Sequence, residues 1–262
     1  MPITFVNVGA AVYSSGGTTG TVYPTLPSGL QVGDLVLVFV TGRGNHNFTS
    51  TVLGRQWQYS HASSGINKIA LFYKFYQTGD GNPDINWTGG GTSQTVIAQA
   101  CAFRGVSTTT PFGVIGASSS NASQANIGPI GGISGVPAGD PIIVFGHRAD
   151  DWTSVATLSG DGLTWYEIGE PKTSSGNDAG EVWDYAFSAG LSVTSKTFTV
   201  TGGLVQTGMG IMQSLKAAVI TTGWRKLQYY TEPPTTGAFN KLKCAVEPPV
   251  SGAFNKLLYD GE

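Results

Sequence analysis

The sequence predicts an all-β protein: a jelly-roll-like β-sandwich with an internal duplication, followed by a short repeated tail. Gly accounts for 38 of the 262 residues, and charged residues make up only 11%, against roughly 25% in an average soluble domain. Gly supplies the positive φ angles that tight turns need. Solvated helices need Glu and Lys, yet the first glutamate is Glu167. The composition therefore favours short strands joined by tight turns.

The strands are predicted from runs of apolar and aromatic residues. Segments 35–40 and 142–145 are continuously apolar and each follows a Gly-Asp turn, which is typical of a strand covered on both faces. Segments 57–63, 69–76 and 182–187 alternate, with aromatic residues that suit a pleated, half-buried surface. Gly-rich turn signals separate these runs, at 78–83, 87–91, 159–162 and 174–178. We expect about seven strands in each copy of the pattern.

The strand pattern occurs twice. Five segments of the first half match five of the second in the same order, at offsets that drift from 106 to 113: 5–11 with 112–118, 29–43 with 135–149, 54–60 with 162–168, 70–80 with 182–192, and 85–95 with 198–208. The copies cover about 1–106 and 107–218, and Trp57 aligns with Trp165, so we expect these two in equivalent places. One large sandwich and two small ones in tandem both fit. The join, 106–134, has no Pro-rich or charged linker, which favours a single body over 1–218.

From residue 219 the sequence repeats with a period of 15. The units read GWRKLQYY, GAFNKLKC and GAFNKLLY, and a Glu-Pro-Pro turn precedes each of the last two. A 15-residue unit is too small to bury its own apolar groups. The tail, 219–262, therefore either packs on its own body or docks on neighbouring subunits, and we prefer the second interpretation. The docking residues would be Trp224, Leu227, Phe239, Leu242, Phe254 and Leu257.

No pattern of catalytic, cofactor-binding or metal-ligating residues is recognised, so the chain is predicted not to be an enzyme. His46, His61 and His147 lack partners at metal-ligand spacing. Glu167 and Glu170 are three residues apart, which on a regular strand would point them to opposite faces and not at one glycosidic bond. Aromatic side chains, Trp57 and Trp165 among them, are candidates for stacking on a glycan. Cys101 lies in an apolar run and is expected in the core.

Charge and hydropathy restrict the partners and the location. The formal net charge is −2 and there is no basic stripe, which gives phosphate neutralisation little to act on and predicts no nucleic-acid partner. No apolar run approaches 18 residues, so no membrane span is predicted. The N-terminal segment lacks the charged and apolar regions of a signal peptide. We expect synthesis in the cytoplasm, with release by assembly into a particle or by lysis.

Several segments resemble tailed-bacteriophage virion proteins, the β-sandwich proteins of tails, fibres and head decorations. They are GLQVGDLVLVFV (29–40), the lone Trp57, IALFYKFYQTGD (69–80) and AQACAFRGVSTTTPF (98–112). The resemblance implies a structural, non-catalytic role in a virion assembled in a host cytoplasm, as a homo-oligomer contacting copies of itself and other virion proteins. A glycan-binding, receptor-recognising module is the alternative, with a host-surface glycan as partner. A polysaccharide-degrading enzyme is the third reading.

Overall fold

The computed structural model describes residues 2–219 except 16, 61–66, 92–93, 151, 174–178 and 203–205. All regular elements among these residues are β-strands, 19 in number, which confirms the predicted all-β class. They belong to one compact unit, Met1–Ile220. No helix that could cross a bilayer occurs in this part of the chain.

The first half forms one large and one small antiparallel sheet. The large sheet has the order β1-β9-β4-β7-β6, and β2 also pairs with β9. The small sheet has the order β3-β8-β5. The strands are β1 (Thr4–Val8), β2 (Val12–Ser15), β3 (Thr19–Val22), β4 (Leu35–Arg43), β5 (His46–Thr49), β6 (Gly54–Ser60), β7 (Asn67–Phe75), β8 (Ile85–Gly89) and β9 (Thr95–Arg104).

The second half repeats this order. Its large sheet runs β10-β19-β13-β16-β15, with β11 also on β19, and its small sheets are β12-β17 and β14-β18. The number of strands exceeds the expected fourteen for two reasons. The first strand of each half is split in two, as β1 and β2 and as β10 and β11, and additional short strands form the small sheets. The strands are β10 (Phe112–Ile115), β11 (Ser119–Gln124), β12 (Ile127–Ile130), β13 (Pro141–Arg148), β14 (Ser154–Val155), β15 (Tyr166–Gly169), β16 (Gly180–Phe187), β17 (Lys196–Phe198), β18 (Val200–Thr201) and β19 (Gln206–Leu215).

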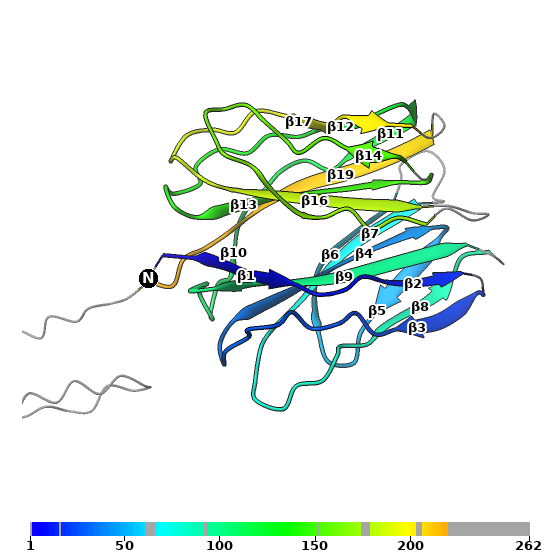
Figure 1. Cartoon of the computed structure of the whole chain (residues 1–262), viewed down its shortest axis with the longest axis horizontal. Helices are drawn as coiled ribbons and strands as arrows, with labels where there is room; N and C mark the ends of the chain where they lie inside the picture. The colour runs from blue at the N-terminus through cyan, green and yellow to red at the C-terminus, as the bar shows by residue number, and fades with distance from the viewer. Residues whose placement is uncertain are drawn as a thin grey trace, which may run out of the picture. The chain divides into compact units, whose positions relative to one another are not determined.

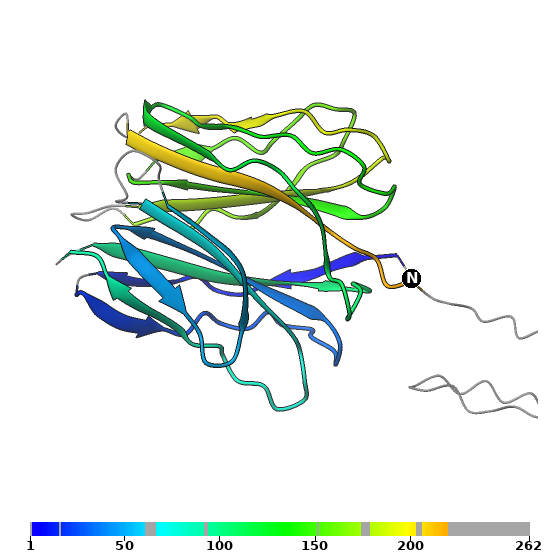
Figure 2. The same cartoon turned by 180° about the vertical axis from the view of Figure 1, so that it is seen from behind.

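The sheets of the body stack in four layers with three hydrophobic cores (Figures 1 and 2). The two large sheets face each other across a central core, where the rings of Phe39 and Phe145 lie 4.9 Å apart between centroids. An outer core separates each large sheet from its small sheets. One contains Phe48 and the other contains Phe198. Each large sheet is therefore covered on both faces.

This layering explains the two continuously apolar segments. In β4, Leu35, Leu37 and Phe39 enter the central core, while the alternate residues Val36, Val38 and Val40 enter an outer core. Each residue of Leu35–Val40 is inaccessible to solvent. Successive side chains of a strand point to opposite faces, so a strand between two cores needs apolar residues at consecutive positions. The prediction of strands covered on both faces is confirmed for β4 and for β13.

The two halves contact each other through corresponding residues. Phe5 of β1 stacks on Tyr185 of β16, with centroids 5.0 Å apart. Phe112 of β10 packs edge-on against Tyr73 of β7 at 4.9 Å. Each contact joins the first strand of one half to the strand that pairs with the central β4 or β13 of the other half. The interface between the large sheets thus has the reciprocal pattern of a twofold interface.

Candidate functional site

The two tryptophans considered for glycan stacking are buried, so that assignment was wrong. Trp57 and Trp165 are each only 7% exposed. Trp57 packs in the central core against Phe145, with ring centroids 5.4 Å apart. Trp165 belongs to the outer core of the second half, where the Lys196 ammonium lies 5.5 Å from its ring centroid. A ring must present an open face to stack on a sugar, and neither ring does.

The expected equivalence of Trp57 and Trp165 holds only for the strands. Trp57 lies in β6, and Trp165 directly precedes β15, the edge strand that corresponds to β6 in the other large sheet. The side chains face different cores, and on β15 it is Ile168 that enters the central core. A shift of one residue moves a side chain to the opposite face of a sheet. Aligning the two halves on their tryptophans therefore pairs residues that lie on opposite faces of the two large sheets.

The six tail residues predicted to dock on subunits, Trp224, Leu227, Phe239, Leu242, Phe254 and Leu257, lie outside the described residues. His61 lies outside them as well. His46 and His147 are both buried, one in each half. No group of three or more His, Cys, Asp or Glu side chains in the described ranges is arranged to hold a metal ion.

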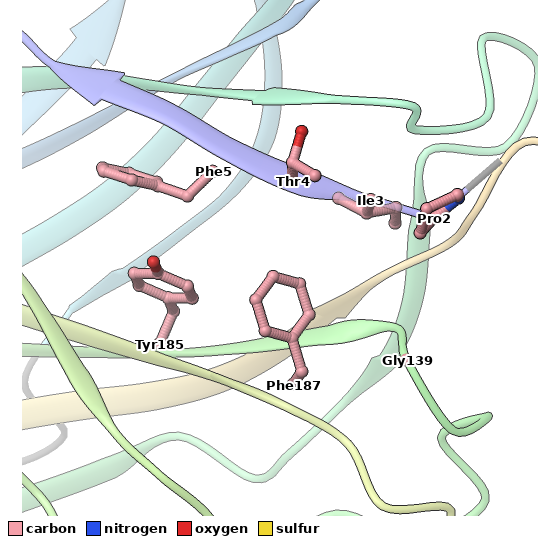
Figure 3. Close-up of a pocket in the computed structure, with 7 residues that line it drawn as sticks. All are labelled: Pro2, Ile3, Thr4, Phe5, Gly139, Tyr185 and Phe187. Atoms are coloured by element: carbon pink, nitrogen blue, oxygen red, sulfur yellow. The ribbon is translucent and has the colours of Figure 1, made fainter.

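An open apolar groove lies between β1 and β16 (Figure 3). It has a volume of about 390 Å³ and is lined by Pro2, Ile3, Thr4, Phe5, Gly139, Tyr185 and Phe187. The rings of Phe5, Tyr185 and Phe187 lie between the two strands in Figure 3. Tyr185 and Phe187 meet at right angles, with centroids 5.8 Å apart. Burial raises the pKa of the Tyr185 phenol above its usual value of 10.0. We call this site the β1–β16 groove.

A second hollow of about 290 Å³ adjoins the β1–β16 groove at Phe187. Tyr166 lines it, stacks on Tyr185 with centroids 5.3 Å apart, and keeps 48% of its surface exposed. The sequence contained a signal for both hollows. Trp183, Tyr185 and Phe187 are spaced by two residues and therefore share one face of β16. This alternation predicts a strand with an aromatic face, but it does not show that the end of the aromatic row stays partly exposed.

The last described residues leave the body beside the β1–β16 groove. The amide of Ala217 donates to the Asp140 carboxylate at 3.1 Å, and Asp140 directly follows the groove residue Gly139. The amide of Ala218 donates to the Gly105 carbonyl oxygen at 2.9 Å. Val219 is then 83% exposed. In both Figure 1 and Figure 2 the end of β19 lies close to the first residues of β1.

The opposite end of the central core contains a cluster of buried polar side chains. Glu181 and His147 are cross-strand neighbours on β16 and β13, and Thr41 and Asn67 lie on the same inner faces of β4 and β7. All four are inaccessible to solvent. Burial raises the pKa of Glu181 well above its usual range, although the nearby Thr41 hydroxyl lowers it slightly. Neither Glu181 oxygen has a hydrogen-bond partner of normal geometry among the described residues.

His147 in this cluster is held as a neutral imidazole. Its Nδ1 lies 2.9 Å from the Gly180 carbonyl oxygen, and a carbonyl only accepts, so Nδ1 carries the proton. Burial lowers the pKa of His147 to about 4. The Nε2 atom has no partner among the described residues. Because the cluster is closed to solvent, the protonation of its groups affects the stability of the fold.

Three carboxyl groups converge on the outer face of β15 and β16, contrary to the geometry of a regular strand. Glu167 and Glu170 both raise the pKa of Asp184, which burial raises first, to about 7. A register irregularity between Glu167 and Gly169 brings Glu170 to the same side, so the expectation of opposite faces was wrong. Asp184 is inaccessible to solvent, and its Oδ2 accepts a 2.7 Å hydrogen bond from the Leu158 amide.

Comparison with known proteins identifies no relative, since no family model, curated protein or solved structure matches the chain.

Proposed function

We propose that this chain is a bacteriophage virion structural protein, a peripheral tail or fibre component or a head decoration. In this proposal the body is a rigid scaffold and the C-terminal repeats dock on other subunits. The observation that carries it is the exit of the chain at Val219. The body is complete there, with three cores of its own, and three repeated aromatic-x-Lys-Leu units still follow. Copies of the chain and other virion proteins are the proposed partners.

We further propose that the body arose by duplication of a jelly roll. The strand orders support this, because β1 to β9 follow the same order as β10 to β19 when β8 is matched with both β17 and β18. A large sheet of order β2-β9-β4-β7 facing a small sheet of order β3-β8-β5 is the connectivity of a jelly roll in which β6 has moved to the large sheet. The reciprocal contacts Phe5–Tyr185 and Phe112–Tyr73 also support this proposal, because a dimer fused into one chain would have contacts of this kind.

The proposal is tested by removing the tail. A chain that ends after Val219 keeps every residue of the three cores, so we expect a folded, soluble body with unchanged circular dichroism. It should fail to enter the particle, measured by the amount of this chain in purified virions after complementation of a phage lacking the full-length protein. Normal incorporation of the truncated chain would contradict the proposal. A full-length chain with Lys226 replaced by Arg is the matched control.

A glycan-binding module is the second candidate, and Tyr166 is the observation that favours it. Tyr166 is 48% exposed, is supported from behind by Tyr185, and lines a hollow with the polar Thr164 and Ser188. Replacing Tyr166 by Ala should abolish binding on a glycan array. Tyr23→Ala, at a 58% exposed tyrosine far from this hollow in sequence, should leave binding unchanged. Absence of binding by the unmodified chain excludes this candidate.

A further inference from the structure

We propose that the β1–β16 groove is the receptor for a tail unit from a second copy of this chain. The inference rests on the proposed docking function of the tail and assigns its partner surface. One aromatic-x-Lys-Leu unit would place its aromatic ring and its leucine against Phe5, Tyr185 and Phe187. The proposed assembly is therefore head to tail, with the groove of one copy occupied by the tail of the next.

The groove has the chemistry that such a unit requires. Its walls are the aromatic and aliphatic side chains of Phe5, Tyr185, Phe187 and Ile3. A volume of about 390 Å³ lies within the roughly 300–1,000 Å³ range of protein binding sites. Phe5 and Phe187 remain partly exposed beside the fully packed central core. An apolar ring inserted there would extend the central core across the boundary between two molecules.

The backbone of β1 offers a second means of attachment. In the order of the large sheet β1 is the terminal strand, and its partner is β9. A terminal strand has one row of peptide groups available to an additional extended segment. Each tail unit has an aromatic residue and, three positions later, a leucine. In the last two units Pro-Pro precedes this segment and limits the length of any strand that it forms. Strand addition and insertion of the aromatic ring can therefore occur together.

The number of units and their point of origin favour a second copy as the occupant. Each copy has one β1–β16 groove but three similar tail units, and three units cannot share one groove. The remaining units can bind such a groove only on other copies of the chain. The tail leaves the body beside the groove, through Ala217 and Asp140. In an assembly with a symmetry axis near this end, the tail of one copy starts close to the groove of the next. Fifteen extended residues span at most about 50 Å, which is enough to cross to a neighbour.

The test uses two full-length variants with complementary defects. The first has Phe187→Ala in the groove and an unchanged tail. The second has an unchanged groove and alanine at Trp224, Phe239 and Phe254. We expect the unmodified chain to self-associate in analytical ultracentrifugation. Each variant should associate roughly thirtyfold or more weakly, the size of an interface hot spot. Mixing the two variants should restore a heterodimer, because each supplies what the other lacks.

Two further variants make the outcome specific to the groove. Phe75→Ala removes the corresponding phenylalanine at the end of β7, the strand equivalent to β16, and should leave association unchanged. Pro2→Arg, at an exposed position on the rim of the groove, should weaken association without removing any core residue. If the tail variant fails to associate while Phe187→Ala and Pro2→Arg associate normally, the tail docks elsewhere and only this inference falls. If the unmodified chain stays monomeric, or if the tail variant associates normally, the proposed docking of the tail on other copies of the chain is contradicted as well.

Discussion

At the scale of single residues, the body buries several titratable groups whose charged forms are disfavoured. His147 is kept neutral with a pKa of about 4, and burial raises the pKa values of Asp184 and Glu181. Asp80 behaves in the opposite way, since hydrogen bonding to Lys74 lowers the pKa of its carboxyl group. A pKa that differs between the folded and unfolded chain makes stability depend on pH. These groups therefore contribute to the pH dependence of stability with opposite signs, and single substitutions can separate their contributions.

Asp184→Asn should stabilise the protein at alkaline pH and not at acidic pH. The pKa of Asp184 is about 7 when folded, against 3.8 as the ordinary value. The folded chain thus binds a proton that the unfolded chain releases, so this contribution to stability is full below about pH 4 and is lost as the pH rises through 7. We expect the variant to gain on the order of a few kcal/mol above pH 7, measured by urea unfolding at pH 4, 6 and 8.

Asp80→Asn is the control for this pH dependence, and its effect should have the opposite sign. The pKa of Asp80 is lowered in the folded protein, so its stabilising contribution is present at neutral pH and is lost as the pH falls through the folded pKa. The variant should therefore be slightly less stable than the unmodified chain at pH 8 and equally stable at strongly acidic pH. A gain for Asp184→Asn that is the same at pH 4 and pH 8 would exclude the titration of Asp184 as its cause.

At the scale of elements, the central strands of the large sheets each serve two cores. Phe39 of β4 is inaccessible to solvent in the central core, and Phe72 of the neighbouring β7 is 1% exposed in the outer core of the same half. Parallel sheets commonly have both faces covered, whereas antiparallel sheets often leave one face to solvent. Each large antiparallel sheet here is covered on both faces. The small sheets of its own half cover one face, and the large sheet of the other half covers the opposite face.

Phe39→Ala and Phe72→Ala should destabilise the body by similar amounts. Both substitutions remove a buried ring and leave a cavity, which costs about 3–5 kcal/mol in the free energy of unfolding. The measurement is urea unfolding followed by intrinsic fluorescence, with Val52→Ala at a 53% exposed position as the control. A loss below about 1 kcal/mol for either phenylalanine would mean that its face of the sheet is not a core.

At the scale of the whole molecule, the central core joins the two halves as a dimer interface would. Leu37, Phe39 and Leu71 of the first half pack in it with Ile143 and Phe145 of the second. Trp183 of the second half also donates a 2.9 Å hydrogen bond from its indole nitrogen to Gln99 of the first. Neither half can leave this apolar face in water, so the two halves depend on each other for stability.

A fragment of residues 1–106 should therefore dimerise. Expressed by itself, the fragment keeps its outer core and exposes the face of Phe39, which a second fragment can cover in the place of the missing half. Light scattering after size-exclusion chromatography should give twice the fragment mass. Phe39→Glu should abolish the dimer, and Val52→Glu, at an exposed position, should preserve it. A well-folded monomer at high concentration would contradict the interpretation of the central core as a dimer-like interface.

The sequence by itself determined the all-β class and the strands covered on both faces, because both depend on local patterns. Continuous apolar residues from Leu35 to Val40 predict two covered faces wherever the partners come from. The tertiary structure decided which residues face which core. Trp57 lies on β6 and Trp165 directly precedes the corresponding strand β15, yet the two side chains face different cores. An irregularity near Gly169 also placed Glu167 and Glu170 on one side. The β1–β16 groove depends on Phe5 meeting Tyr185 and Phe187, which are about 180 residues away in the sequence. The face that a side chain takes follows from the register of strand pairing, and a shift of one residue moves every side chain to the opposite face. Strands that pair here, such as β1 and β9, are far apart in the sequence, so their register cannot be read from either strand alone.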